Sequence, residues 1–151
     1  YAMMTLLGSV VVAGGYSISP WYLVGALVYL AYGIGGAFWI MYFLCPYCGY
    51  HATRGCNCGF GRIAGIMRAK QPKGMFRGQF KRHIPVIVPL WFIPPALGIW
   101  FLVRHFQWPL LIVLALFAVN SFVILPLTSS RKNCATCPQH GDCPWHGNTC
   151  R

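Results

Sequence analysis

Three long stretches without a charged side chain limit what this sequence can fold into. Residues 21–44, 84–103 and 109–127 contain no Asp, Glu, Lys or Arg. About 20 mainly apolar residues in a helix are enough to cross the hydrocarbon core of a bilayer. A shorter apolar stretch runs up to about Tyr16, and we interpret it as a further span because no basic segment of a signal peptide precedes it. The sequence therefore predicts an all-α integral membrane protein with four transmembrane helices arranged as two hairpins.

The charge composition excludes several classes of enzyme. Only 9% of the residues are charged, and Asp142 is the single acidic side chain beside 12 Lys and Arg. A soluble domain carries about 25% charged residues. One carboxylate cannot supply a pair for acid–base catalysis, a Ca²⁺ or Mg²⁺ site, or an internal acidic proton relay. We therefore do not expect this chain to be an enzyme on its own.

The basic residues predict how the spans are oriented. Eight of the 12 lie between the second and third spans, three follow the fourth span, and Arg104 lies in the turn between the third and fourth. Four spans place the long loop and the C-terminal tail on the same side of the membrane. The positive-inside rule assigns that side to the cytoplasm. We therefore expect an integral, multi-pass protein whose loop and C-terminus are cytoplasmic.

The spans divide the chain into four regions. These are transmembrane hairpin 1 at 1–44, a Cys-rich basic loop at 45–83, transmembrane hairpin 2 at 84–127 and a Cys-rich tail at 128–151. Within the hairpins, small residues spaced four apart predict close helix contacts, namely Ala31 with Gly35 and Gly33 with Ala37. Pro94 and Pro95 predict a kink or break in the third span. Asn120 and Ser121 are expected to form hydrogen bonds between helices.

All eight cysteines fall into two groups, each directly after a predicted hairpin. The first group has the spacing C-x2-C-x7-C-x-C and consists of Cys45, Cys48, Cys56 and Cys58. The second has the spacing C-x2-C-x5-C-x6-C and consists of Cys134, Cys137, Cys143 and Cys150, with His140 and His146 between them as further candidate ligands. Because both groups follow even-numbered spans, we expect them at the same membrane surface.

This pattern indicates metal binding. A C-x2-C pair lets two thiolates converge on one ion, and the returning chain supplies the other ligands. Four thiolates suit zinc or an iron–sulfur cluster. The nearby cations Arg54, Arg131 and Lys132 would offset the negative charge of such a site. The sequence therefore predicts one or two cysteine-ligated sites that hold zinc or an iron–sulfur cluster, with the two groups either separate or pooled.

Disulfides and thiol redox chemistry are the alternatives. Disulfides need an oxidising compartment, whereas the charge pattern places both groups on the reducing side. The segment Cys45-Pro46-Tyr47-Cys48 is identical to the active-site tetrapeptide of glutaredoxins, but the resemblance covers four residues and the βαβ context is absent. A closer alternative is a quinone-linked disulfide-forming membrane oxidoreductase, since these enzymes are also four-helix proteins with a C-x2-C pair. Their reactive thiols face the oxidising side, and this chain has twice the cysteines they need.

Haem is not expected in this chain. Gly49 and Pro138 follow the two C-x2-C pairs, where covalent c-type attachment needs a histidine. His83 and His105 lie at opposite ends of the third span. In a helix that rises 1.5 Å per residue they are about 33 Å apart, so they cannot share one iron.

The loop also contains a basic segment, residues 60–83, with apolar residues at helical spacing. The pattern runs from Phe60 to Met67, is interrupted at 71–74 and resumes at Met75. Such a segment is typical of an amphipathic element in the headgroup plane, with its cations on anionic lipid headgroups. An acidic soluble subunit is another candidate for this surface. Nucleic acid, the other usual partner of a chain with net charge +11, is not expected because the cations flank the spans.

Two functional hypotheses follow. In the first, the chain is a small non-catalytic subunit of a larger respiratory or redox membrane complex, and its cysteine-bound metal is a structural staple or an electron relay. In the second, it is a quinone-linked thiol–disulfide oxidoreductase. The first is favoured because the loops are too short to house a catalytic domain and lack acid–base residues.

Overall fold

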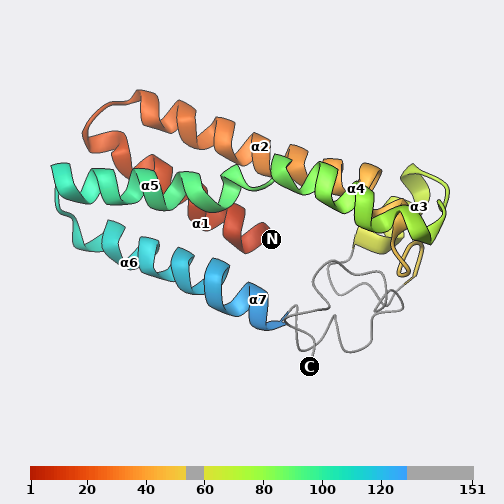
Figure 1. Ribbon diagram of the computed structural model, residues 1–151. Helices are drawn as coiled ribbons and strands as arrows, with labels where there is room; N and C mark the ends of the chain where they lie inside the picture. The colour runs from red at the N-terminus through yellow and green to blue at the C-terminus, as the bar shows by residue number, and fades with distance from the viewer. Residues whose placement is uncertain (54–59, 129–151) are drawn as a thin grey trace. The chain divides into compact units, whose positions relative to one another are not determined.

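The computed structural model describes residues 1–53 and 60–128, and every regular element within them is helical (Figure 1). The chain divides into two compact units. The bundle unit comprises Tyr1–Gly35 and Ile87–Leu125, and the loop unit comprises Gly36–Val86 and Pro126–Arg151. The prediction of an all-helical protein is confirmed for the described residues.

Three helical stretches of the described chain are long and apolar enough to cross a membrane. They are Trp21–Tyr47, Phe76–Arg104 and Trp108–Thr128. Each of them contains one of the charge-free stretches of the sequence. A further apolar helix, Ala2–Ser17, is shorter. By length and composition, these helices support the prediction of a membrane protein.

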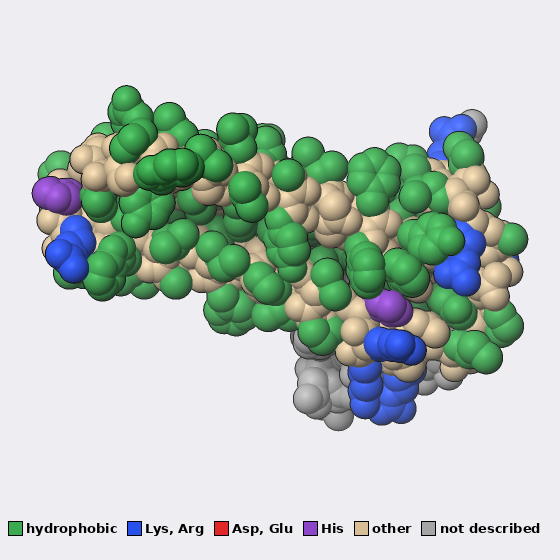
Figure 2. All heavy atoms as spheres, turned by 90° about the horizontal axis from the view of Figure 1, so that it is seen from above, with side chains coloured by type: hydrophobic (Ala, Val, Ile, Leu, Met, Phe, Trp, Pro, Cys, Tyr) green, Lys and Arg blue, Asp and Glu red, His purple; other side chains and the backbone are tan. Residues whose placement is uncertain are grey.

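The bundle unit is built from α1 (Ala2–Ala13), the first part of α2 (Trp21–Phe43), α5 (Pro89–Arg104) and α6 (Trp108–Ala118). α1 packs against both α5 and α6 (Figure 1). The buried core of the unit includes Met4, Val11, Val12, Leu90, Phe101 and Phe117. Hydrophobic side chains also cover most of the unit's visible surface in Figure 2. Helices that are apolar on their outer as well as their inner faces are typical of a protein surrounded by lipid.

Glycines set the distance between helices in the bundle unit. A Cβ atom at Gly33 would lie 2.5 Å from Cγ2 of Thr5, so α2 and α1 approach each other there as closely as a missing side chain allows. Gly35, which the sequence pairs with Ala31, has nothing within 4 Å of such a Cβ position. Of these two glycines, only Gly33 therefore makes a close helix contact within the described residues.

α5 runs without a break through Pro94 and Pro95, where a kink or break was expected. Pro94 has no N–H to donate to the carbonyl of Leu90, four residues earlier. The hydroxyl of Tyr29 donates to that carbonyl instead, at 2.7 Å, and this hydrogen bond is buried. The chain is less regular before Pro89, where α5 begins after a 3-10 turn. A neighbouring helix therefore supplies the donor that the proline lacks.

The last apolar stretch changes its helical form. After α6, residues Val119–Ile124 form a π-helical segment, and α7 (Leu125–Thr128) follows. Pro126 lacks an N–H and its ring crowds the carbonyl four residues earlier, so the wider π turn relieves this contact. Asn120 and Ser121 are buried here, as residues that bond between helices would be. The expectation for Ser121 is nevertheless wrong within the described chain, because its Oγ has no hydrogen-bond partner there.

The loop unit contains the end of α2, a 3-10 turn at Cys45–Tyr47, α3 (Phe60–Met67) and α4 (Phe76–His83). α3 and α4 occupy the segment that the sequence predicts as amphipathic. They are separated by residues 68–75, which include the predicted interruption at 71–74. The pattern of apolar residues therefore located both short helices.

Aromatic rings join α4 to the end of α2 within the loop unit. The imidazole of His83 stacks on the ring of Phe43, with ring centroids 4.8 Å apart and planes inclined by 18°. Trp39 packs against the same imidazole at 5.7 Å between centroids. Nε2 of His83 also lies 3.1 Å from Oε1 of Gln79. These contacts hold the last turn of α4 beside the last turns of α2.

Candidate functional site

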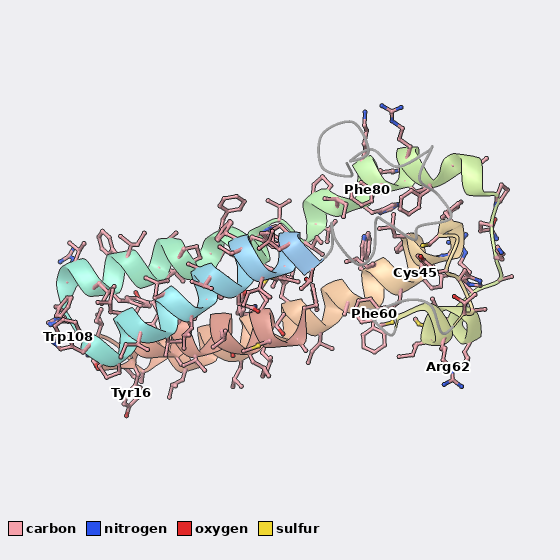
Figure 3. All side chains as sticks on the ribbon, turned by 90° about the horizontal axis from the view of Figure 1, so that it is seen from below. Tyr16, Cys45, Phe60, Arg62, Phe80 and Trp108 are labelled. Atoms are coloured by element: carbon pink, nitrogen blue, oxygen red, sulfur yellow. The ribbon has the colours of Figure 1, made fainter. Side chains whose placement is uncertain are left out.

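Cys45 and Cys48 lie at the two ends of one short turn that directly follows α2. Figure 3 shows Cys45 at the end of that helix. The backbone N–H of Cys48 donates to the carbonyl of Cys45 at 3.0 Å and closes the turn. Pro46 lies at the start of the turn, where its fixed φ and its missing N–H are both tolerated. The two cysteines are half-buried, and a single turn of the backbone presents both thiols.

The chain after α3 holds this turn in place. The backbone N–H of Gln71 donates to the carbonyl of Pro46 at 2.9 Å. Pro46 and Tyr47 are both buried. The conformation between the two cysteines is therefore fixed by hydrogen bonding and packing within the protein.

His51 is a residue of this site that the sequence analysis missed. Its side chain is only 6% exposed, and its Nε2 donates to the carbonyl oxygen of Arg68 at 3.0 Å. Its backbone N–H donates to the carbonyl of Cys48 at 3.1 Å. Cys45, Cys48 and His51 recur every third residue, as Cys134, Cys137, His140, Cys143 and His146 do in the second cysteine group. Because its ring is bonded to the carbonyl of Arg68 and its backbone to that of Cys48, we assign His51 the role of joining the cysteine turn to the end of α3.

Arg68 supports the same turn through its charge. Its Nη1 donates to the carbonyl of Tyr42 at 3.4 Å, and its guanidinium lies 5.2 Å from the centre of the Tyr42 ring. A cation at the C-terminus of a helix is favourable, because the last carbonyls of the helix are unpaired and carry partial negative charge. Arg68 thus caps α2 immediately before the cysteine turn.

The chain after His51 turns sharply back toward α3. Ala52 has a φ of 61°, in the left-handed region that a residue with a Cβ seldom adopts. Its N–H donates to the carbonyl of Gly61 at 2.9 Å. A Cβ at Gly65 would lie 2.8 Å from Cβ of Ala52, so α3 can approach the loop this closely only with glycine at position 65. These contacts fix α3 on the loop that contains Cys48.

The described residues thus contain half of the ligand set that the first cysteine group was predicted to supply. Two thiolates in a C-x2-C turn are the usual first half of a four-thiolate zinc or iron–sulfur site, so the turn fits such a group. Residues 1–53 and 60–128 contain no group of three His, Cys, Asp or Glu side chains able to hold a metal ion. The other predicted ligands lie outside the described residues; they are Cys56, Cys58, Cys134, Cys137, His140, Cys143, His146 and Cys150.

Comparison of the chain with protein-family models, with curated proteins and with solved structures finds no match. The functional assignment therefore depends on the residues of this chain and on their geometry.

Proposed function

We propose that this chain is a small, non-catalytic integral membrane subunit of a larger respiratory or redox complex. Its cysteines would ligate zinc or an iron–sulfur cluster, in one or two sites, as a structural staple or an electron relay. The observation that supports this most directly is the C-x2-C turn itself. It lies immediately after an apolar helix, and hydrogen bonds from Gln71, His51 and Arg68 hold its surroundings.

The membrane arrangement that we propose has four spans in two hairpins. In the bundle unit, the turn after α1 and the turn before α6 are joined by a hydrogen bond from Nε2 of Gln107 to Oγ of Ser17, at 3.1 Å. Large aromatic side chains are exposed around these two turns, among them Tyr16, Trp21 and Trp108. Aromatic residues of this kind gather where helices leave the hydrocarbon core. In a bundle of two membrane-spanning hairpins, the two turns must lie at the same end, and the hydrogen bond between these turns supports that arrangement.

Sidedness follows from charge in this proposal. In the proposed four-span topology, the cysteine groups follow the second and fourth spans and would therefore lie on the side of the membrane opposite the two joined turns. Because eleven of the 12 Lys and Arg residues also fall on that side, it would be the cytoplasmic one. Cytoplasmic cysteines favour metal ligation over disulfides, because that compartment keeps thiols reduced.

The alternative is a quinone-linked thiol–disulfide oxidoreductase. It is favoured by one observation, which is that Cys45 and Cys48 lie in a single turn. Oxidation of these two thiols to a disulfide would pass two electrons and two protons to a quinone. This chemistry needs the thiols on the oxidising side of the membrane, so the side on which they lie decides between the two functions.

Thiol labelling on intact cells tests this. A membrane-impermeant maleimide is applied before and after permeabilisation, and labelled peptides are identified by mass spectrometry. We expect Cys45 and Cys48 to be labelled only after permeabilisation and unfolding in a metal chelator. A His105→Cys variant, which places a thiol in the exposed turn before α6, is the control and should be labelled on intact cells. Labelling of Cys45 and Cys48 on intact cells after mild reduction would instead support the oxidoreductase.

A further inference from the structure

We propose that α3 lies in the headgroup layer of an anionic bilayer, with Ile63, Ile66 and Met67 inserted toward the acyl chains. The proposal deepens the proposed function, because it rests on the chain being a membrane protein. It is carried by the direction in which α3 faces, which is opposite to that of an amphipathic helix in a soluble protein.

The packed face of α3 consists of small residues. Gly61 and Ala64 are buried, and Gly65 lies against Ala52. The hydrogen bond from Ala52 N–H to the carbonyl of Gly61 fixes the start of the helix on the same loop. The rotation of α3 about its axis is therefore determined by backbone-to-backbone contact within the loop unit.

The opposite face of α3 is apolar and exposed. Ile66 is 88% exposed, Ile63 is 47% exposed and Met67 is 37% exposed. At 100° per residue, these three side chains fall on the side of the helix away from Gly61, Ala64 and Gly65. A surface helix in water turns its apolar stripe toward the core and its polar side outward. An outward stripe of this kind needs an apolar environment to cover it.

The position of α3 along the chain places it at the surface of a membrane. Residues just after α3 donate hydrogen bonds to the end of α2 and to the turn that follows it. Nη1 of Arg68 donates to the carbonyl of Tyr42, and the backbone N–H of Gln71 donates to the carbonyl of Pro46. α3 is therefore held at the depth where α2 ends. With eight residues it is about 12 Å long, too short to cross the bilayer itself.

Charge identifies the bilayer as the occupant and anionic lipid as its component. Arg62 is exposed and extends away from α3 (Figure 3), and Lys70 is exposed just beyond the helix. Apolar residues flanked by exposed cations match the acyl boundary and the phosphates of an anionic leaflet. Arg68 is not part of this surface, because its guanidinium lies over Tyr42.

Photocrosslinking of the full-length chain tests the proposal. p-Benzoylphenylalanine replaces Ile66, and the protein is reconstituted into vesicles of phosphatidylcholine with phosphatidylglycerol. Illumination should attach lipid at position 66, and the share of phosphatidylglycerol among the adducts should exceed its share in the vesicles by about twofold or more. The same substitution at Thr53, which is exposed on the loop rather than on α3, should give no lipid adduct.

A third position separates this proposal from the membrane assignment. Ile112 is an exposed apolar residue on α6, and a crosslinker there should also attach lipid. Lipid adducts at 112 with none at 66, or adducts from 66 to a second copy of the chain or to another protein, would overturn the proposal for α3 and leave the membrane assignment standing. An absence of lipid at both positions would overturn both.

Discussion

At the scale of single residues, two buried side chains donate hydrogen bonds to backbone carbonyl groups of distant residues. The carbonyl of Leu90, which Pro94 cannot serve, accepts from Tyr29. The carbonyl of Arg68, which follows the end of α3, accepts from His51. Both donors are buried, and a buried carbonyl without a partner costs about 1–3 kcal/mol. We therefore expect Tyr29 to stabilise the bundle unit and His51 to stabilise the cysteine turn.

The Tyr29→Phe substitution removes one hydroxyl and keeps the ring. It should destabilise the bundle unit by about 1–2 kcal/mol, because the carbonyl of Leu90 then has no donor in an apolar environment. Thermal unfolding in detergent measures this loss. Tyr16→Phe, at an exposed ring beside the turn after α1, is the matched control and should leave the midpoint unchanged. Equal midpoints for the two variants would show that the hydrogen bond is unimportant.

The His51→Ala substitution should loosen the cysteine turn. Loss of this part-buried hydrogen bond, worth about 1–2 kcal/mol, corresponds to roughly a 5- to 30-fold rise in the population of the open loop. Alkylation of Cys45 and Cys48 in the folded, metal-depleted protein should accelerate by a similar factor. His105→Ala, at an exposed histidine in another turn, serves for comparison. Unchanged alkylation rates in His51→Ala would remove the supporting role assigned to this residue.

At the scale of elements, the ends of α2 follow from the sequence and the details of the other spans do not. The charge-free stretch 21–44 nearly coincides with α2 at Trp21–Phe43, because both hydropathy and helix length point to the same residues. The stretch 84–103 begins before α5 does, since hydropathy does not register the backbone effects of Pro85 and Pro89. The continuity of α5 through Pro94 also escapes prediction, because it depends on Tyr29 from a distant part of the chain.

The candidate site could be predicted only in part, because some of its contacts are local in the sequence and others join distant residues. The spacing of Cys45 and Cys48 is local, so the sequence identified the pair, and the structure places both in one turn. The support from His51 and Arg68 depends on where α3 returns to the loop, which spacing along the chain does not encode.

Glycines along α2 provide a test at this scale. Gly33→Ala should destabilise the protein by about 1–2 kcal/mol, because the new Cβ would overlap Thr5 and the repacking cost exceeds the gain in helix propensity. Gly35→Ala places the same atom in open space, so it should be neutral or slightly stabilising. Unfolding midpoints of the two variants give the comparison. Equal midpoints, or a less stable Gly35→Ala protein, would contradict the packing described for α1 and α2.

At the scale of the whole molecule, the chain combines a single carboxylate with a largely apolar helical exterior. Its single acidic side chain leaves no pair for acid–base chemistry. Within residues 1–53 and 60–128, three helical stretches are long and apolar enough to cross a membrane, and their exteriors are largely hydrophobic. Such surfaces suit packing against further membrane helices as well as against lipid.

A subunit should therefore migrate as part of a complex. Membranes solubilised in mild detergent and separated on a native gel should give a band far above the 16.9 kDa of this chain, with other membrane proteins in it. Chemical crosslinking before solubilisation controls for dissociation in the detergent. Recovery of a lone monomer from crosslinked membranes would contradict the subunit proposal.

Elemental analysis of the purified protein tests the central claim, which is that the cysteines ligate metal. We predict about one or two equivalents of zinc, or of an iron–sulfur cluster with acid-labile sulfide, per chain. Cys48→Ser should lose one equivalent if the groups are separate and all of the metal if they are pooled, whereas His105→Ala should retain the full amount. Protein that contains four intact disulfides and no metal would contradict the account.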